Sequence, residues 1–194
     1  MDLYSKHSIN IVPVVAVDYS LANLTFDEGQ YTIHTLKENA PNDYIDCMKS
    51  VAKTFRHFNR FMMAYGFGAR TIMDDSVPPT NVFSMTGDFL SPFVVEEKDL
   101  VESYKETLKN VKLSLPVVYK DLVKHVCDVA AKEMGEEKVQ RNITEVKNYY
   151  VLVLMMAGMV DDFKETLEQM FRAKNLPISI LVIKIGKNSE ENDQ

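Results

Sequence analysis

The stretch Ile11-Val12-Pro13-Val14-Val15-Ala16-Val17 runs directly into Asp18-Tyr19-Ser20-Leu21-Ala22-Asn23, and this junction decides the fold. A continuous apolar run of this length predicts a strand covered on both faces, as in a parallel sheet. An Asp-x-Ser-x-Ser run at the end of such a strand opens a divalent-cation site, because its carboxylate and hydroxyls supply hard oxygens. Asp18 and Ser20 match that pattern, whereas Ala22 stands in place of the second hydroxyl.

The composition is ordinary for a globular protein and excludes several classes of function. The 194 residues allow one domain with a sizeable core, and 46% of them are hydrophobic and 26% charged. The net charge of −6 and the lack of any basic run argue against a nucleic-acid binder. The polar amino terminus is no signal peptide, and no apolar run reaches the length of a membrane span. We therefore expect a cytoplasmic protein that does not insert into membranes.

Apolar runs alternate with amphipathic stretches along the chain, which predicts an α/β fold. Strands are expected at 11–17, 31–36, 61–68, 149–156 and 178–185, and helices at 43–59, 97–111, 118–134 and 161–174. Segment 70–97 is rich in turn residues, so we expect short edge strands or a binding loop there. Residues 1–186 are expected to form a single domain, followed by a polar, disordered tail at 187–194.

Four stretches, in this order and spacing, resemble the von Willebrand factor A-type (vWA) domain of the copine family. They are Val15–Asn23, then Ile33-His34 with Pro41-Asn42-Asp43-Tyr44, then Tyr65-Gly66-Phe67-Gly68-Ala69, and finally Leu176-Pro177-Ile178-Ser179-Ile180. Together they span residues 9 to 186. The resemblance implies a three-layer, doubly wound, mostly parallel sheet flanked by helices, an arrangement similar to the Rossmann fold.

The resemblance also implies a metal-ion-dependent adhesion site with five ligand positions at the carboxyl rim of the sheet. Asp18 and Ser20 match two of them, and Ala22 departs from the third. Val117 stands where the copine loop Pro-Thr-Asn-Phe has its threonine, and Ala157 stands where the copine pattern has a second aspartate. Mg²⁺ prefers an octahedron of hard oxygens, so we expect no functional magnesium site here.

The expected function is that of a non-enzymatic, intracellular interaction domain that binds a protein partner without a cofactor. Its partner surface is either the 70–97 loop or the former metal rim. At the rim, the candidate residues are Asn23, Phe67, Tyr119, Asp161 and Asp162. Copines belong to a calcium-dependent phospholipid-binding family and carry paired modules for that purpose. Membrane recruitment of this domain would come only through such parts, which are absent from this chain.

The alternative is a ligand-binding vWA domain that depends on Mg²⁺ or Mn²⁺ held weakly by Asp18 and Ser20. Asp161 and Asp162 are a further source of carboxylates for such a site. With the metal role gone, Asp18 is instead expected to bond the amides of a turn, with Ser20 and Asn23 as turn residues.

Nothing in the sequence supports catalysis. His34, His57 and His125 lack metal-ligand spacing and are expected to be packed or surface histidines. A nucleophile elbow of the type Gly-x-Ser-x-Gly is missing from the chain.

Overall fold

Four long strands form the parallel centre of one sheet in the computed structural model, which describes residues 9–25, 31–37, 40–74, 76, 78–134, 146–158 and 161–186. Their order is β10 (Ile178–Lys184), β9 (Asn148–Met156), β1 (Asn10–Asp18) and β4 (Met62–Phe67). At the far edge, β6 (Phe83–Ser84) and β7 (Phe93–Val94) pair antiparallel with β4. The predicted mostly parallel, doubly wound sheet is therefore confirmed.

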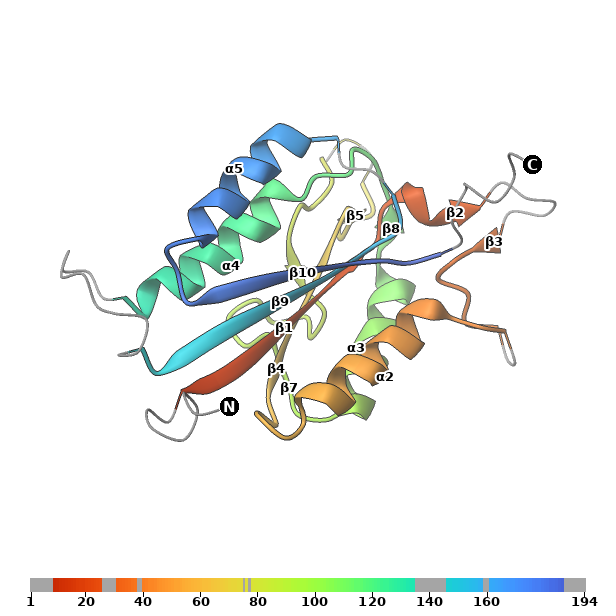
Figure 1. Cartoon of the computed structure of the whole chain (residues 1–194). Coiled ribbons are helices and arrows are strands. Elements are labelled where there is room, and N and C mark those ends of the chain that lie inside the picture. The colour runs from red at the N-terminus through yellow and green to blue at the C-terminus, as the bar shows by residue number, and fades with distance from the viewer. Residues whose placement is uncertain are drawn as a thin grey trace, which may run out of the picture.

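Helices cover both faces of this sheet, which gives the three layers that the sequence predicts (Figure 1). One face carries α2 (Asp43–Phe55) and α3 (Glu97–Asn110), and the other carries α4 (Lys120–Lys132) and α5 (Phe163–Ala173). Short elements lie at the carboxyl rim. These are the 3-10 turn η1 (Leu21–Asn23) and two small sheets, β2 (Leu24–Thr25) with β3 (Tyr31–Thr32) and β5 (Ala69–Arg70) with β8 (Lys112–Leu113).

Two expectations about secondary structure need correction. The strand expected at 31–36 is only two residues long and pairs with β2 outside the main sheet, because the chain turns at Ile33 and His34 and buries the imidazole of His34. The helix expected at 43–59 ends at Phe55. Segment 70–97 holds β6, β7 and the end of β5, as expected of short edge strands. The predicted tail at 187–194 lies outside the described residues.

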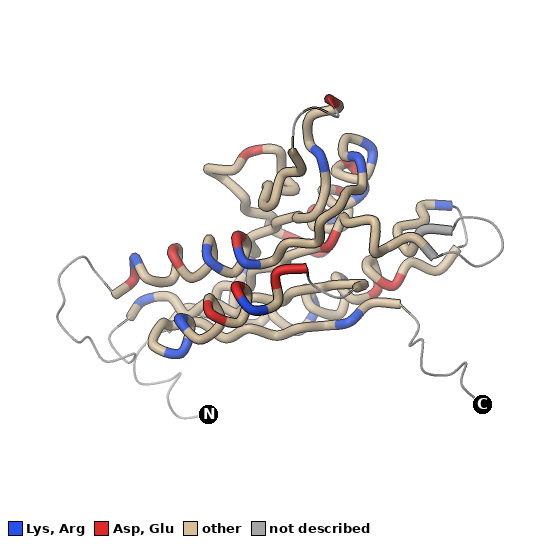
Figure 2. Tube along the Cα trace, turned by 90° about the horizontal axis from the view of Figure 1, so that it is seen from above, with Lys and Arg blue, Asp and Glu red and all other residues tan. Residues whose placement is uncertain are grey.

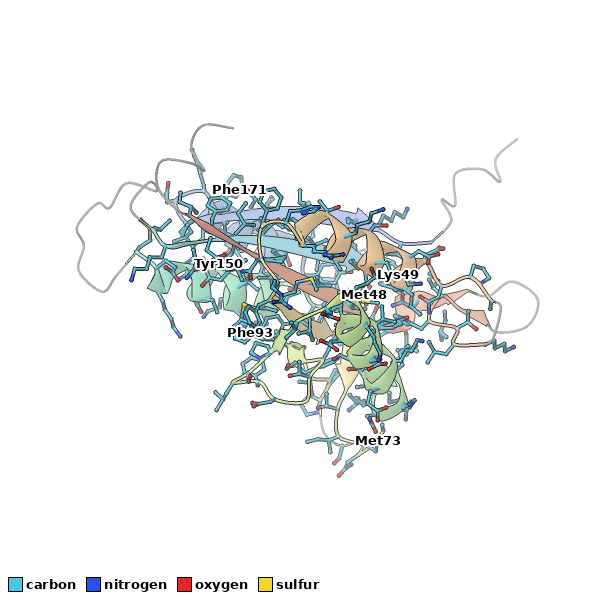
Figure 3. All side chains as sticks on the ribbon, turned by 90° about the horizontal axis from the view of Figure 1, so that it is seen from below. Met48, Lys49, Met73, Phe93, Tyr150 and Phe171 are labelled. Carbon is cyan, nitrogen blue, oxygen red and sulfur yellow. The ribbon has the colours of Figure 1, made fainter. Side chains whose placement is uncertain are left out.

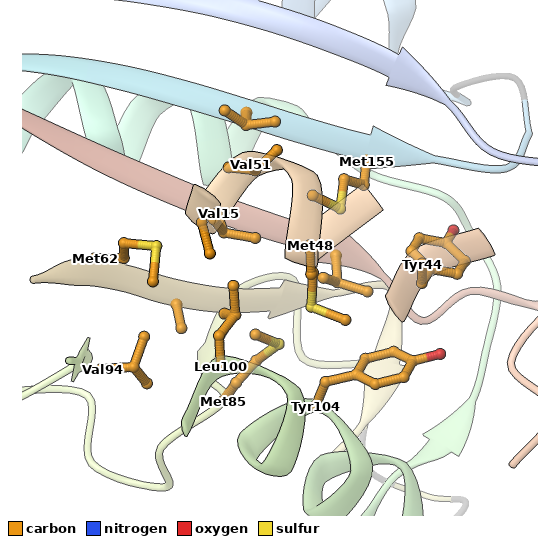
Figure 4. Close-up of a cluster of buried hydrophobic side chains, with 14 of the residues drawn as sticks. Val15, Tyr44, Met48, Val51, Met62, Met85, Val94, Leu100, Tyr104 and Met155 are labelled. Carbon is orange, nitrogen blue, oxygen red and sulfur yellow. The ribbon is translucent and has the colours of Figure 1, made fainter. Parts of the chain in front are cut away.

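The core alternates between the two faces along each central strand. In β1, Val15 and Val17 point toward α2 and α3, whereas Val14 and Ala16 point toward α4 and α5. Successive side chains of a strand lie on opposite faces, so a strand covered twice needs an apolar residue at nearly every position. Figure 4 shows the first cluster, in which side chains of α2 and α3 meet those of β1, β4 and β9.

The charged residues are spread over the outside of the molecule. Figure 2 shows Lys and Arg interspersed with Asp and Glu along the helices. In the part of the chain that the structure describes, no helix is long and apolar enough to cross a bilayer.

Candidate functional site at the carboxyl rim of the sheet

Asp18 ends β1 and is fully buried, and its carboxylate is bonded entirely by groups of this chain. One oxygen, Oδ1, accepts the backbone N–H of Ser20 at 2.8 Å. The other, Oδ2, accepts the hydroxyl of Tyr119 at 3.2 Å and the backbone N–H of Ala157 at 3.2 Å. Burial raises the pKa of Asp18, and these hydrogen bonds act in the opposite direction. The expectation that Asp18 bonds turn amides is confirmed.

The turn after Asp18 is held by side chains of its own residues. Asn23 is buried and donates from Nδ2 to the carbonyl oxygens of Asp18 at 2.9 Å and of Ser20 at 3.0 Å. Ser20 accepts the N–H of Ala22 on its hydroxyl oxygen at 3.3 Å and so caps η1. Gly68 approaches this turn closely. Its φ is 77°, a conformation that favours glycine. A Cβ added at Gly68 would also lie only 2.9 Å from the Cβ of Ser20, so no larger residue fits here.

His34 lies between two tyrosine rings beneath this turn. Its ring stacks on Tyr19, with centroids 5.3 Å apart, and on Tyr44, with centroids 4.6 Å apart. Nε2 lies 2.9 Å from the carbonyl oxygen of Asp18, which only accepts, so Nε2 carries the proton. Nδ1 then accepts the hydroxyl of Tyr104 at 2.8 Å. Burial lowers the pKa of His34 to about 4, so the ring is neutral at pH 7.

Asn42 and Tyr44 connect this histidine to the start of α2. Asn42 caps the helix by accepting the N–H of Ile45 on Oδ1 at 3.0 Å, and its Nδ2 donates to the Tyr104 hydroxyl at 3.2 Å. Tyr44 donates its hydroxyl to Oδ1 of Asn23 at 2.7 Å. Burial raises the pKa of both Tyr44 and Tyr104. The strand end, the turn and two helices thus share one buried hydrogen-bond network.

Tyr119 closes the site from the other face. Its ring meets Phe67 edge to face with centroids 4.8 Å apart, and both side chains are fully buried. Burial, and then the nearby Asp18 carboxylate, raise the pKa of Tyr119, so its hydroxyl keeps the proton that it donates.

The carboxylate of Asp162 fixes the backbone next to that ring. Oδ1 accepts the N–H of Tyr119 at 3.0 Å, and Oδ2 accepts the N–H of Lys120 at 2.9 Å. Asp162 precedes α5 but caps α4, a role the sequence pattern did not indicate. Its neighbour Asp161 accepts the N–H of Val117 at 2.7 Å. Both carboxylates thus bond the backbone of residues 117 to 120.

A model of the copine family matches residues 32–193, which is more than half of the chain. The chain belongs to the copine family. Two relatives, both called nicotinic receptor-associated protein 1, come from Caenorhabditis briggsae and Caenorhabditis elegans. The first is 28% identical over 181 residues, covering 91% of this chain and 27% of that protein. The second is 26% identical over 179 residues, covering 91% of this chain and 26% of that protein. The chain thus spans about a quarter of the length of these relatives.

Among solved structures, the manganese-loaded TRAP protein of Plasmodium vivax is similar, with a TM-score of 0.49 and 13% identity. The similarity covers 95% of this chain and 61% of that chain.

The five positions that the resemblance implies as ligand positions lie at the rim. Ser20 and Ala157 donate backbone N–H groups to the Asp18 carboxylate. Ala22 lies so close to Gly158 that a Cβ on that glycine would collide with the Ala22 methyl group. Val117 is buried in the apolar cluster against which Ala22 packs. Within the described ranges, no group of three or more His, Cys, Asp or Glu side chains is arranged to hold a metal ion.

Four of the five rim residues expected to face a partner are buried in the interior of this copine domain. These are Asn23, Phe67, Tyr119 and Asp162, and each of them is buried, whereas Asp161 is exposed. The four cannot form an exposed contact surface in this conformation, because their side chains stabilise the rim from within. Sequence reasoning did not assign Tyr44 and Tyr104 to the site, since a tyrosine at helical spacing is indistinguishable from ordinary core, and it used Asn42 only as part of a copine-like stretch.

Proposed function

We propose that this copine-family domain binds a protein partner without a divalent cation and without catalysing a reaction. The observation that carries this proposal is the Asp18 carboxylate, on which three donors of the chain itself converge. Tyr119 stands where the copine loop has phenylalanine, so its hydroxyl adds a donor that the copine pattern lacks. Asp18 and His34 are both buried and bonded within the chain, which supports a binding role over a catalytic one.

The residues around Asp18 fit a cation poorly. Mg²⁺ asks for six oxygens in near-octahedral geometry, and Ala22, Val117 and Ala157 present only methyl and isopropyl groups. A cation on the carboxylate would also displace the hydrogen bonds from Tyr119 and Ala157. Each buried donor left unpaired costs about 1–3 kcal/mol. The few oxygen ligands available to the cation would have to offset the cost of both lost hydrogen bonds.

The partner surface is better placed on segment 70–97 than on the rim. This segment exposes six large apolar side chains, Ile72, Met73, Phe89, Leu90, Phe93 and Val95. Leu90 is 94% exposed at the tip of the turn before β7. Figure 3 shows Met73 and Phe93 apart from each other, because Phe93 pairs with the start of β4 whereas Met73 follows its end. Phe89, Leu90 and Phe93 follow one another closely in this segment, and exposed apolar side chains that gather in this way mark interaction sites on soluble proteins.

Hydrogen bonds within the chain stabilise the turn that carries Leu90. Asp88 accepts the N–H of Leu90 at 2.9 Å, and Thr86 donates its hydroxyl to the carbonyl of Ser91 at 3.0 Å. The carbonyl of Pro92 accepts the N–H of Ala64 at 2.8 Å and ties the turn to β4. A preorganised anchor loses little conformational entropy on binding, which favours affinity.

The relatives' name, nicotinic receptor-associated protein 1, makes a nicotinic receptor the first partner to test. Binding of the purified chain to the receptor is measured in EDTA, with Leu90→Glu as the test variant. A central anchor contributes 1.4 kcal/mol or more, so we expect at least about a tenfold loss of affinity. Leu36→Glu, at an exposed apolar residue outside segment 70–97, is the matched control and should bind normally. Binding that needs Mn²⁺, or that Leu90→Glu leaves intact, contradicts the proposal.

Independence from metal is tested by melting the chain in EDTA, in millimolar Mg²⁺ and in millimolar Mn²⁺. A cation that binds only the folded state raises the melting temperature. We expect the same melting temperature in all three solutions, and an equal decrease in all three for Asp18→Ala. A rise of several degrees with Mn²⁺ that Asp18→Ala abolishes would establish the cation-dependent alternative instead.

A further inference from the structure

β10 is the outermost strand on its side of the sheet, and no strand in the described part of the chain pairs with its outer edge. The carbonyl of Pro177 accepts the N–H of Tyr150, and the N–H of Ile185 donates to Met156, so odd-numbered residues bond β9. In a parallel pair the backbone groups alternate in direction, so Ile180, Val182 and Lys184 direct their N–H and C=O groups outward. An edge with open backbone groups is a template for another strand.

A stripe of exposed apolar side chains runs along α5 beside this edge. Phe163, Leu167 and Phe171 follow at intervals of four residues and therefore share one face of the helix. Their exposed fractions are 65%, 39% and 68%. A groove of about 380 Å³ separates α5 from β10 and is lined by Met170 and Val182, among others. Figure 3 shows Phe171 on the β10 side of the molecule, away from Phe93.

We propose that β10 and the exposed side of α5 form a self-association surface, on which a second copy of this chain pairs its own β10 in antiparallel orientation. Centring the pair on Val182 places Ile180 opposite Lys184 of the other copy and Lys184 opposite its Ile180. Ile180, Val182 and Lys184 of one copy then each exchange backbone hydrogen bonds with an outward-directed residue of the other copy. The edge is therefore complementary to itself, which favours a second copy over a strand of unrelated sequence.

The single charged side chain of β10 supports the antiparallel orientation. Lys184 ends the strand, and the other six residues are five apolar ones and a serine. In the antiparallel pair the two lysines lie four residues apart, about 13 Å at the rise of a strand. That separation exceeds the Debye length of about 8 Å at physiological salt, so their repulsion is largely screened. A parallel pair would place the two lysines side by side.

The surface is large enough for a specific, reversible dimer. A fully exposed aromatic side chain has about 200 Å² to bury, so Phe163 and Phe171 together offer about 260 Å². With Leu167, Leu181 and Val182, the last two 49% and 52% exposed, each copy contributes on the order of 500 Å². Two copies then bury about 1,000 Å², which is the lower bound for a specific interface.

The test is the mass of the purified chain by light scattering at about 100 µM, a concentration that populates a dimer of micromolar Kd. We expect twice the chain mass of 22.2 kDa. Phe171→Glu and Val182→Pro should each give the mass of one chain. Val182→Pro removes only an outward-directed N–H, since even-numbered residues do not bond β9, and proline is tolerated at such edge positions. Val182→Thr keeps that N–H and is the matched control.

Hydrogen exchange gives a second measurement that uses the wild-type chain alone. The amides of Val182 and Lys184 should exchange slowly in the dimer and more than tenfold faster when the chain is diluted far below the Kd of the dimer. Leu90→Glu should remain dimeric although it loses partner binding, which separates this proposal from the proposed function. A wild-type chain that is monomeric at about 100 µM, or a dimer that survives both Phe171→Glu and Val182→Pro, overturns the proposal.

Discussion

Acidification from pH 7 to pH 5 should destabilise this domain through the single buried histidine at the rim. His34 has an ordinary pKa of 6.5, which burial lowers to about 4 in the folded chain. Between these two pKa values the unfolded chain therefore binds a proton on His34, whereas the folded chain does not. Stability contributed by neutral His34 is complete above pH 6.5 and decreases as the pH falls toward 4.

The magnitude follows from the difference between the two pKa values. Each pKa unit corresponds to about 1.4 kcal/mol, so the full effect below pH 4 is about 3 kcal/mol, and at pH 5 it is about 2 kcal/mol. Asp18 acts in the opposite direction, because its raised pKa makes the folded chain take up a proton as the pH falls. The contribution of His34 to the pH dependence must therefore be separated from that of Asp18 by comparison with a variant that lacks the histidine.

The assay is urea unfolding at pH 7, 6 and 5, followed by tyrosine fluorescence, since the chain has nine Tyr and no Trp. His34→Phe keeps the stacking on both tyrosine rings but cannot titrate. It should be less stable than wild type at pH 7, because Tyr104 and the Asp18 carbonyl lose a partner, and the gap should shrink by about 2 kcal/mol at pH 5. His57→Gln, at an exposed histidine, should follow wild type. Equal pH slopes in wild type and His34→Phe, or a nuclear magnetic resonance titration of His34 centred near its ordinary pKa of 6.5, would refute the reasoning.

Three further substitutions test the rim. Asp162→Ala should lower the free energy of unfolding in urea by about 2 kcal/mol, because the N–H groups of Tyr119 and Lys120 at the start of α4 lose their acceptor. Tyr119→Phe should lower it by about 1 kcal/mol, the contribution of one hydrogen bond, and a larger change would mean that the ring moves. Gly66→Ala should lower the melting temperature by several degrees, because the new methyl group meets the rings of Phe83 and Tyr19; an unchanged value would show that both rings can move away.

Much of the fold is predictable because its central strands are apolar at nearly every position. The runs at 11–17 and 149–156 correspond to β1 and β9, and α3 begins and ends within one residue of its predicted bounds. Short strands are harder to predict, since two residues carry no periodicity. The strand predicted at 31–36 failed for this reason, and also because the burial of His34 depends on rings from β1 and α2 that local sequence does not reveal.

The position of the candidate site was predictable, whereas the direction of its side chains was not. A strand end locates Asp18 at the rim, and the copine pattern brings Ala22, Val117 and Ala157 to the same place. Whether a rim side chain points outward depends on its hydrogen-bond partners. Tyr119 is far from Asp18 in sequence and reaches it only through the packing of α4, so pattern alone could not show that its hydroxyl lies inside.

The two edges of the sheet differ in a way that limits how many copies could assemble. β10 offers seven residues, but the opposite edge consists of β6 and β7, each two residues long and bonded to different parts of β4. A head-to-tail arrangement would need a long, open strand on both sides, and among the described residues such a strand stands on one side only. Association through β10, as proposed above, would therefore end with two copies and would not continue into a fibre.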